Sequence, residues 1–335
     1  MTPDGPPTAV PPAPPLSVDV LYGPGERERA LREDVRAGLT SAPKWLSPQW
    51  FYDERGSQLF DAITRLPEYY LTSREREILR ERADEIALLT DANTLVELGS
   101  GTSEKTRLLL DALAERGSLR RFVPFDVSEE TLRTSAVAVR SEYPEVEVHG
   151  VVGDFGRHLG ALPPGRRRMI AFLGSTIGNL EPAARGRFLA AVASVLSPGE
   201  TLLLGVDLVK DVGRLEAAYA DPAGLTAEFN RNILRVLNNE LGADFVPERF
   251  EHVAEWDPDN EWIEMRLRSD RAQNVRVAAL ELQVAFEGGE QFRTEISAKF
   301  RREGVEAELA QVGLDLVRWW PHASSDFALL LARAY

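Results

Sequence analysis

Residues 94–106, TLVELGSGTSEKT, decide the fold class of this chain. A short apolar strand, TLVEL, ends at a Gly-Ser-Gly turn, and the polar residues that follow lead into a helix. The same pattern continues along the chain, with strands expected at 94–98, 120–128, 146–155, 167–180 and 201–209. Short apolar strands that alternate with helices predict an α/β fold with a parallel, doubly wound sheet.

The glycine turn after the first strand could hold a phosphate, a dinucleotide or S-adenosylmethionine (SAM). A phosphate-binding P-loop needs glycine where Glu104 stands, because a side-chain carboxylate there would project into the phosphate site. The dinucleotide motif G-x-G-x-x-G also has Glu104 at its third glycine, where a carboxylate competes with a pyrophosphate for the helix N-terminus. SAM carries no phosphate, so Glu97, Gly99 and Gly101 suit SAM best.

Acidic residues stand at the ends of the next two predicted strands. Asp126, in FDVSEE, is placed to accept hydrogen bonds from a ribose diol, and Asp154, in VVGDF, to accept from an adenine amino group. Phe155 could lie against the adenine ring, and Lys105 could pair with the carboxylate of SAM. Each aspartate alone also fits a helix cap or a turn. Because the carboxyl ends of parallel strands meet at one edge, the set together predicts a SAM site.

Composition excludes several other classes of function. The chain has 335 residues, a formal net charge of -14 and no cysteine, which disfavours nucleic acid as a partner and excludes disulfides and thiolate nucleophiles. Its four histidines lack the HExxH spacing of a metal site, so no metal is expected. No apolar run reaches the roughly 18 residues that span a bilayer. We therefore expect a cytoplasmic protein with no membrane contact, in which residues 1–20 form a proline-rich disordered tail.

Regions outside the strand–helix repeat give weaker signals. The aromatic residues between 43 and 70 predict either a small aromatic core or a lid over a small ligand. Thr72 and Glu75 have the spacing of a capping box at a helix start. The repeat stops near Lys210, residues 280–300 have the alternation of a hairpin that turns at Gly288 and Gly289, and residues 314–334 predict two more strands.

Six segments together resemble a known family. VELGSGTSEKTRLLL, FDVSEETL, VVGDF and FLGSTIGNL, with PEYYLTSRE before them and FRTEISAKF after them, are similar to the histidine-specific methyltransferases of ergothioneine biosynthesis. The resemblance runs from about residue 20 to the C-terminus. It implies SAM-dependent transfer of three methyl groups to the α-amino nitrogen of L-histidine, giving hercynine (histidine betaine). It also implies a class I SAM-methyltransferase domain (74–208 and 300–335) and a mixed α+β substrate-binding domain (21–73 and 209–299), and we expect a monomer.

The resemblance also assigns residues to the two ligands. It implies SAM contacts from Gly99, Lys105, Asp126, Asp154 and Phe155. It implies L-histidine contacts from Tyr69, Asn179, Tyr219, Glu295, Ile296 and Ser297. It places Tyr52, Phe60, Thr226 and Met265 in the lining of the same pocket.

The chemistry of these residues is consistent with that substrate. Glu295 and Ser297 are two apart on a predicted strand and therefore share a face, where they could bond the two ring nitrogens of an imidazole. Asn179 and Tyr219 can donate to the substrate carboxylate. No certain base is present, so Asn179, Tyr52 and Tyr69 are expected to position the amine or relay its proton.

Other interpretations stay open on the residues alone. Without the resemblance, alternating polar residues around 295 would indicate an ordinary surface strand. The main alternative is a SAM-dependent N-methyltransferase for another amino acid or small amine. A SAM-binding protein without catalysis and a nicotinamide oxidoreductase are less favoured, the latter because of Glu104.

Overall fold

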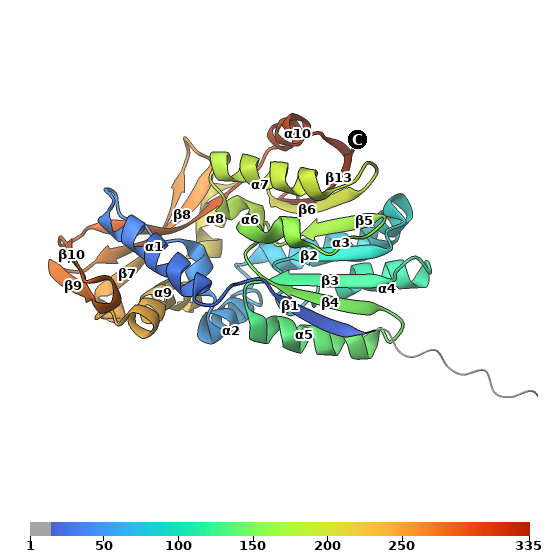
Figure 1. The fold of residues 1–335 in the computed structure, drawn as a ribbon. Helices are drawn as coiled ribbons and strands as arrows, with labels where there is room; N and C mark the ends of the chain where they lie inside the picture. The colour runs from blue at the N-terminus through green and yellow to red at the C-terminus, as the bar shows by residue number, and fades with distance from the viewer. Residues whose placement is uncertain (1–14) are drawn as a thin grey trace, which may run out of the picture.

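The computed structural model describes residues 15–335, and its centre is an eight-stranded sheet (Figure 1). The strand order is β1-β4-β3-β2-β5-β6-β13-β12. The strands are β1 (Leu16–Val20), β2 (Thr94–Leu98), β3 (Arg121–Asp126), β4 (Glu147–Val152), β5 (Arg168–Phe172), β6 (Thr201–Asp207), β12 (Leu314–Pro321) and β13 (Phe327–Ala334). Neighbours from β1 to β6 pair in parallel, and β13 pairs antiparallel with both β6 and β12. The predicted doubly wound α/β sheet and the two C-terminal strands are confirmed.

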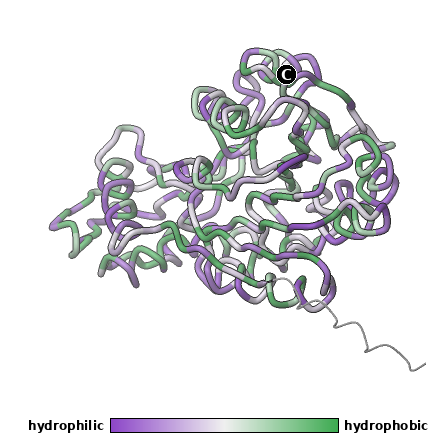
Figure 2. Tube along the Cα trace, turned by 45° about the vertical axis from the view of Figure 1, so that its right-hand side comes forward, coloured by the Kyte–Doolittle hydropathy of each residue, from purple (hydrophilic) through white to green (hydrophobic). Residues whose placement is uncertain are grey.

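Helices cover both faces of this sheet. One apolar cluster contains Leu95 of β2 and residues of α3 (Tyr70–Thr90), α4 (Arg107–Glu115) and α5 (Glu129–Glu142). The other contains Val96, the next residue of β2, and residues of α7 (Pro182–Val195) and α10 (Arg302–Gln311). Because successive side chains of a strand point to opposite faces, the two clusters are the two sides of the sheet. Figure 2 shows hydrophobic and hydrophilic residues interspersed along the chain.

A second region joins segments from both ends of the sequence. It contains the helices α1 (Glu26–Thr40), α2 (Glu54–Ile63), α8 (Val212–Tyr219) and α9 (Leu225–Leu241). Its three-stranded antiparallel sheet has the order β11-β8-β7, built from β7 (Phe250–Asp257), β8 (Trp262–Ser269) and β11 (Gln291–Ala298). A two-stranded sheet pairs β9 (Gln273–Val277) with β10 (Leu282–Phe286). Figure 1 shows α1, in blue, beside these orange strands, and the Leu46 N–H donates to the Arg293 carbonyl at 2.8 Å.

The expected tail over residues 1–20 is too long at its C-terminal end. Leu16–Val20 form β1, which pairs in parallel with β4 at the edge of the main sheet. The proline-rich run ends at Pro15, and LSVDV has the alternation of an edge strand, which the proline content of the preceding residues obscured. Residues 1–14 lie outside the described part of the chain.

The predicted hairpin over residues 280–300 is wrong in its pairing. Both strands exist and the chain reverses near Gly289, whose φ is +83°. However, β10 pairs with β9, whereas β11 pairs with β8, so the two belong to different sheets. Alternation identifies a strand and its buried face, but it does not identify the neighbouring strand.

The predicted capping box at Thr72 is also wrong. The helix α3 begins at Tyr70, so Thr72 lies inside its first turn. Glu75 is fully buried and does not reach back to the start of the helix. Its carboxylate instead bonds the Gly174 N–H and the Lys105 ammonium.

Among the helices within residues 15–335, none has both the length and the apolar character needed to cross a membrane.

Candidate active site

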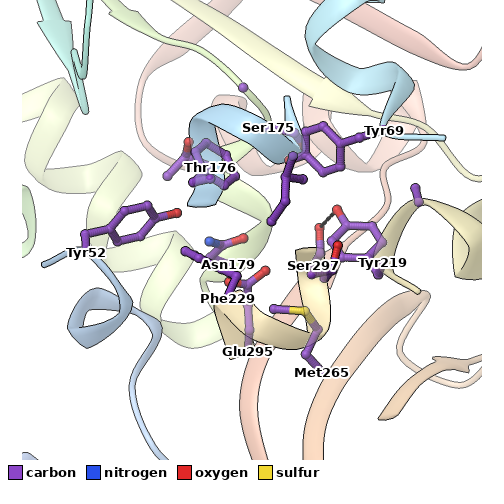
Figure 3. Close-up of a pocket in the computed structure, with 15 residues that line it drawn as sticks. Tyr52, Tyr69, Ser175, Thr176, Asn179, Tyr219, Phe229, Met265, Glu295 and Ser297 are labelled. Atoms are coloured by element: carbon purple, nitrogen blue, oxygen red, sulfur yellow. Dashed lines mark hydrogen bonds between the residues drawn. The ribbon is translucent and has the colours of Figure 1, made fainter. Parts of the chain in front are cut away.

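A pocket lies where the loop after β5 meets α2, α9 and β11 (Figure 3). Nine of the ten residues expected around the substrate line it. They are Tyr52, Phe60, Tyr69, Asn179, Tyr219, Thr226, Met265, Glu295 and Ser297. Figure 3 shows Tyr52 on one side, Tyr219 and Ser297 on the other, and Asn179 and Glu295 between them. The structure therefore brings together residues that lie up to 245 positions apart in the sequence.

Strand β11 supplies two of these residues from one face. Glu295 and Ser297 both line the pocket, as their spacing predicts. Ile296, between them, has its side chain on the opposite face, in the apolar cluster that also contains α7 and α10. The side chain of Ile296 therefore does not line the pocket, and any contact with a ligand would have to come from its backbone.

Glu295 is a buried carboxyl group with no hydrogen-bond partner among residues 15–335. It is 8 % exposed, and its partner in the antiparallel pairing of β11 with β8 is Met265. Burial raises the pKa of Glu295 to about 8, although the nearby Lys299 ammonium acts in the opposite direction. An isolated buried carboxyl group is costly unless something pairs with it, so this group is suited to accept a hydrogen bond from a ligand N–H.

Beside Glu295, the hydroxyls of Tyr219 and Ser297 are linked. Their oxygens are 2.7 Å apart. The ammonium of Lys299 donates to both, at 3.0 Å and 2.8 Å respectively, and its Nζ lies 3.0 Å from a carboxylate oxygen of Asp207. Burial lowers the pKa of Lys299, whereas the Asp207 carboxylate favours its charged form.

The aromatic residues between 43 and 70 lie partly in the core and partly around the pocket. Trp50 and Phe51 are buried in the core. Tyr52 and Phe60 contact edge to face, with ring centroids 5.7 Å apart, and line the pocket together with Tyr69. Burial raises the pKa of both Tyr52 and Tyr69 well above the ordinary value. Both hydroxyls therefore keep their protons at neutral pH and can donate or relay, but neither is a phenolate base.

The loop after β5 carries Asn179 into the pocket. Gly174 has φ +77°, which favours glycine, and the short turn Thr176–Asn179 follows it. At Gly178 a Cβ would lie 2.9 Å from the backbone oxygen of Ala298. This close approach explains the second glycine of GSTIGNL, and it places Asn179 next to the end of β11.

The glycine turn after β2 fits the adenosyl part of SAM. Gly99 and Gly101 have φ values of +68° and +48°, and a Cβ at either would meet no atom within 4 Å, so the space above the turn is open. The Gly101 N–H donates to one oxygen of Asp126 at 2.8 Å, and the Ser128 N–H donates to the other at 2.9 Å. These bonds fix Asp126 at the rim of the turn, with lone pairs left for a ribose diol.

Asp154 and Phe155 lie at the carboxyl end of the neighbouring strand β4. One carboxylate oxygen of Asp154 accepts from the Gly156 N–H at 2.7 Å and so caps the short helix α6 (Phe155–His158). The ring of Phe155 packs edge to face on Phe172 and Phe188, at 5.2 and 5.6 Å between centroids. The second oxygen lies 3.7 Å from the Arg157 guanidinium, and the adenine contact of Asp154 stays a prediction.

Lys105 has a partner that the sequence did not suggest. Its ammonium pairs with Glu75, whose other oxygen accepts from the Gly174 N–H at 2.7 Å. Lys105 is thus held between the glycine turn and the loop that carries Asn179. Its contact with the SAM carboxylate stays a prediction. Glu75 stands in the quoted segment PEYYLTSRE, where the capping-box pattern gave it a different role.

Sequence reasoning also missed Lys299 and Asp207. Lys299 follows Glu295 and Ser297 at the same two-residue interval, so the argument that grouped those two would have included it. Asp207 ends β6 just as Asp126 ends β3, and it is fully buried. Six further lining residues were not predicted: Ile63, Gly174, Ser175, Thr176, Ala218 and Phe229.

Comparison with known proteins identifies the family. The sequence profile described as histidine-specific methyltransferase, SAM-dependent, matches residues 31–334. This chain belongs to that family. It is 59 % identical to the histidine N-alpha-methyltransferase of Mycolicibacterium smegmatis, over 90 % of this chain and 94 % of that protein. It is also 59 % identical to the histidine N-alpha-methyltransferase of Mycobacterium tuberculosis, over 95 % of this chain and 99 % of that protein. It is also 33 % identical to ergothioneine biosynthesis protein 1 of Neurospora crassa, over 92 % of this chain and 36 % of that protein.

Family membership agrees with the geometry of the sheet. The main sheet is that of a class I SAM-methyltransferase, with the glycine turn and the strand-end acids at its carboxyl edge. The separate antiparallel strands β7 to β11 all lie between residues 250 and 298. The division of the whole chain into two domains at the predicted boundaries stays a prediction.

Proposed function

We propose that this protein transfers three methyl groups from SAM to the α-amino nitrogen of L-histidine, giving hercynine, as the first step of ergothioneine biosynthesis. The observation that carries the proposal is the pair Glu295 and Ser297. An unpartnered buried carboxyl group and a hydroxyl share one face of β11 in a pocket that adjoins the glycine turn through Lys105, Glu75 and Gly174. This arrangement complements the two nitrogens of an imidazole. The family description and the names of the relatives support the same substrate.

The chain's own residues would hold SAM at the carboxyl edge of the main sheet. Asp126 would accept from the ribose hydroxyls, Asp154 from the adenine amino group, and Lys105 would pair with the carboxylate. Phe155 would lie against the adenine ring, and the open space at the Gly99 turn would admit the adenosyl group. SAM supplies an electrophilic methyl group on a cationic sulfur.

Four residues would orient the histidine. Glu295 accepts from one ring N–H and Ser297 bonds the other ring nitrogen. Asn179 donates to the carboxylate, and the Tyr219 hydroxyl, 2.7 Å from that of Ser297, holds Ser297 in place. These contacts fix the amino acid at three points, so its amine is held in one orientation. Alignment of the amine with the methyl group would then be the main source of rate acceleration.

The amine must lose its proton before it attacks. Tyr52 and Tyr69 keep their own protons, so they would pass the proton toward water rather than store it. Their rings, with that of Phe60, also offer aromatic faces to the quaternary ammonium that the third transfer produces. We further propose that the enzyme acts as a monomer in the cytoplasm and needs no metal.

The first test is mass spectrometry of the purified protein with SAM and each of the twenty amino acids. We expect histidine to gain three methyl groups and the other nineteen to stay unmodified. Methylation of a different amino acid would keep the SAM site but refute the imidazole assignment of Glu295 and Ser297. No product with any of them would refute methyl transfer to an amino acid.

A further inference from the structure

We propose that Lys299 is a positioning residue that fixes the hydrogen of the Ser297 hydroxyl toward the pocket, so that the site recognises a ring nitrogen without a proton. The inference rests on the proposed function and deepens it. It concerns a residue that was not expected at the site, and it explains why a hydroxyl, which can donate or accept, would act only as a donor here.

Lys299 is a fully buried ammonium with all its hydrogens engaged. Its side chain is 0 % exposed, and three acceptors lie around Nζ: Asp207 at 3.0 Å, Tyr219 at 3.0 Å and Ser297 at 2.8 Å. An ammonium has three N–H donors and no acceptor. Each of the two hydroxyl oxygens therefore accepts one hydrogen from Lys299, and the third hydrogen of the ammonium goes to Asp207.

Counting the remaining hydrogens leaves one donor for a ligand. The oxygens of Tyr219 and Ser297 are 2.7 Å apart, so one hydroxyl donates to the other. A phenol is the stronger donor, so Tyr219 donates to Ser297. The Ser297 oxygen then accepts two hydrogen bonds, from Lys299 and Tyr219, and its own hydrogen has only the pocket to face.

Glu295 completes the recognition from the same strand. Burial favours the protonated form of Glu295 in the empty pocket, whereas a ring N–H beside it favours the carboxylate, which can only accept. Ser297, held by Lys299, can only donate. The pair therefore matches a ring that has one N–H and one bare nitrogen at the two positions. A side chain that has two N–H groups, or none, leaves one of these two buried groups unpaired, which weakens its binding.

Asp207 holds the ammonium in place and also has other partners. It is fully buried and accepts from the Tyr70 hydroxyl at 2.9 Å and from the Lys210 ammonium. Lys210 contacts the same carboxylate as Lys299, but it bonds the Tyr70 hydroxyl at 2.7 Å and does not line the pocket. Loss of Lys299 therefore leaves Asp207 paired, and Lys210 offers a matched control.

The test is a double-mutant cycle on histidine binding, measured by calorimetry with S-adenosylhomocysteine as the second probe. In Lys299→Met we expect the Kd for histidine to rise roughly 5- to 100-fold, the range expected when a buried hydrogen-bond partner is lost. The Kd for S-adenosylhomocysteine should stay within about twofold, because Lys299 does not contact the glycine turn. Lys210→Met should leave both constants within about twofold.

The cycle separates positioning from a structural role. If Lys299 acts through the Ser297 hydroxyl, Lys299→Met should have little further effect in a Ser297→Ala background. Equal effects of Lys299→Met in both backgrounds would overturn the inference, as would an unchanged Kd in the single variant. Should Lys299→Met not fold, the pair Asp207→Asn/Lys299→Met removes both charges and is measured in the same way.

Failure of the inference differs from failure of the proposed function. Wild-type protein that binds and methylates histidine, with no specific effect of Lys299→Met, overturns the inference alone. Wild-type protein that does not bind histidine overturns the proposed function, and the inference with it.

Discussion

At the scale of single residues, Glu295 links stability to pH. Burial raises its pKa to about 8, so between about pH 4.5 and pH 8 the folded state binds a proton that the unfolded state releases. Stability is therefore lost as the pH rises through this window. We expect Glu295→Gln, which cannot ionise, to be more stable than the wild type by about 1–3 kcal/mol at pH 8.5, and by much less at pH 5.5.

Urea unfolding at the two pH values, without ligands, measures this difference. Glu287→Gln is the matched control, because Glu287 is exposed in the folded protein and its substitution should change stability by no more than about 0.5 kcal/mol at either pH. A Glu295→Gln variant whose stability relative to the wild type is the same at both pH values would show that burial does not raise the pKa of Glu295.

Residues whose chemistry follows from strand position could be predicted from the sequence. Glu295 and Ser297 were placed on one face by their spacing, and Asp126 at the rim of the glycine turn by its position at a strand end. Lys299 and Asp207 were missed because they act on other side chains of the protein. The two-residue interval groups Lys299 with Glu295 and Ser297, but the roles of Lys299 and Asp207 depend on which strand ends meet in space, and local patterning does not reveal that.

At the scale of elements, the carboxylate of Glu75 joins α3 to the glycine turn and to the loop after β5. Glu75 bonds both Lys105 and the Gly174 N–H, and a Cβ at Gly205 of β6 would lie 2.1 Å from one of its oxygens. Glu75→Ala leaves a buried N–H and a half-buried ammonium unpaired, so we expect a loss of about 2–4 kcal/mol in the free energy of unfolding. Chemical denaturation of the purified variant measures the loss.

The control for this prediction lies on the same helix. Glu81 is exposed, and Glu81→Ala should change stability by no more than about 0.5 kcal/mol. Similar values for the two variants would mean that the bonds of Glu75 contribute nothing net. The capping-box pattern could not foresee this role, because Thr72 and Glu75 have the right spacing but the helix begins two residues earlier, at Tyr70.

The pairing of elements was less predictable than their existence. The strands at 94–98, 201–209 and 314–334 were placed correctly because apolar runs and turn signals are local. The strand β8 was not recognised, since WIEMRLRS contains three charged residues. Without β8, the sequence offered β11 no partner except β10, and the wrong hairpin followed.

At the scale of the whole molecule, the pocket depends on segments that are distant in the sequence. Tyr52 comes from the N-terminal part, Asn179 from the main sheet, and Glu295 from the second sheet. Histidine in the pocket would contact all three, so its binding stabilises their arrangement as a unit. At 100 times its Kd, a ligand that binds only the folded state adds about 2.7 kcal/mol to stability.

Hydrogen exchange measured with and without histidine, in the presence of S-adenosylhomocysteine, tests this unit. We expect amide protection to rise together in α2, in residues 174–179 and in β11, because each of these segments supplies a wall of the pocket. The helix α10 and the strands β9 and β10 supply no lining residue among those described and should exchange at unchanged rates. Protection confined to the main sheet would mean that histidine does not engage Glu295 and Ser297, and the second region would then have no part in recognising the substrate.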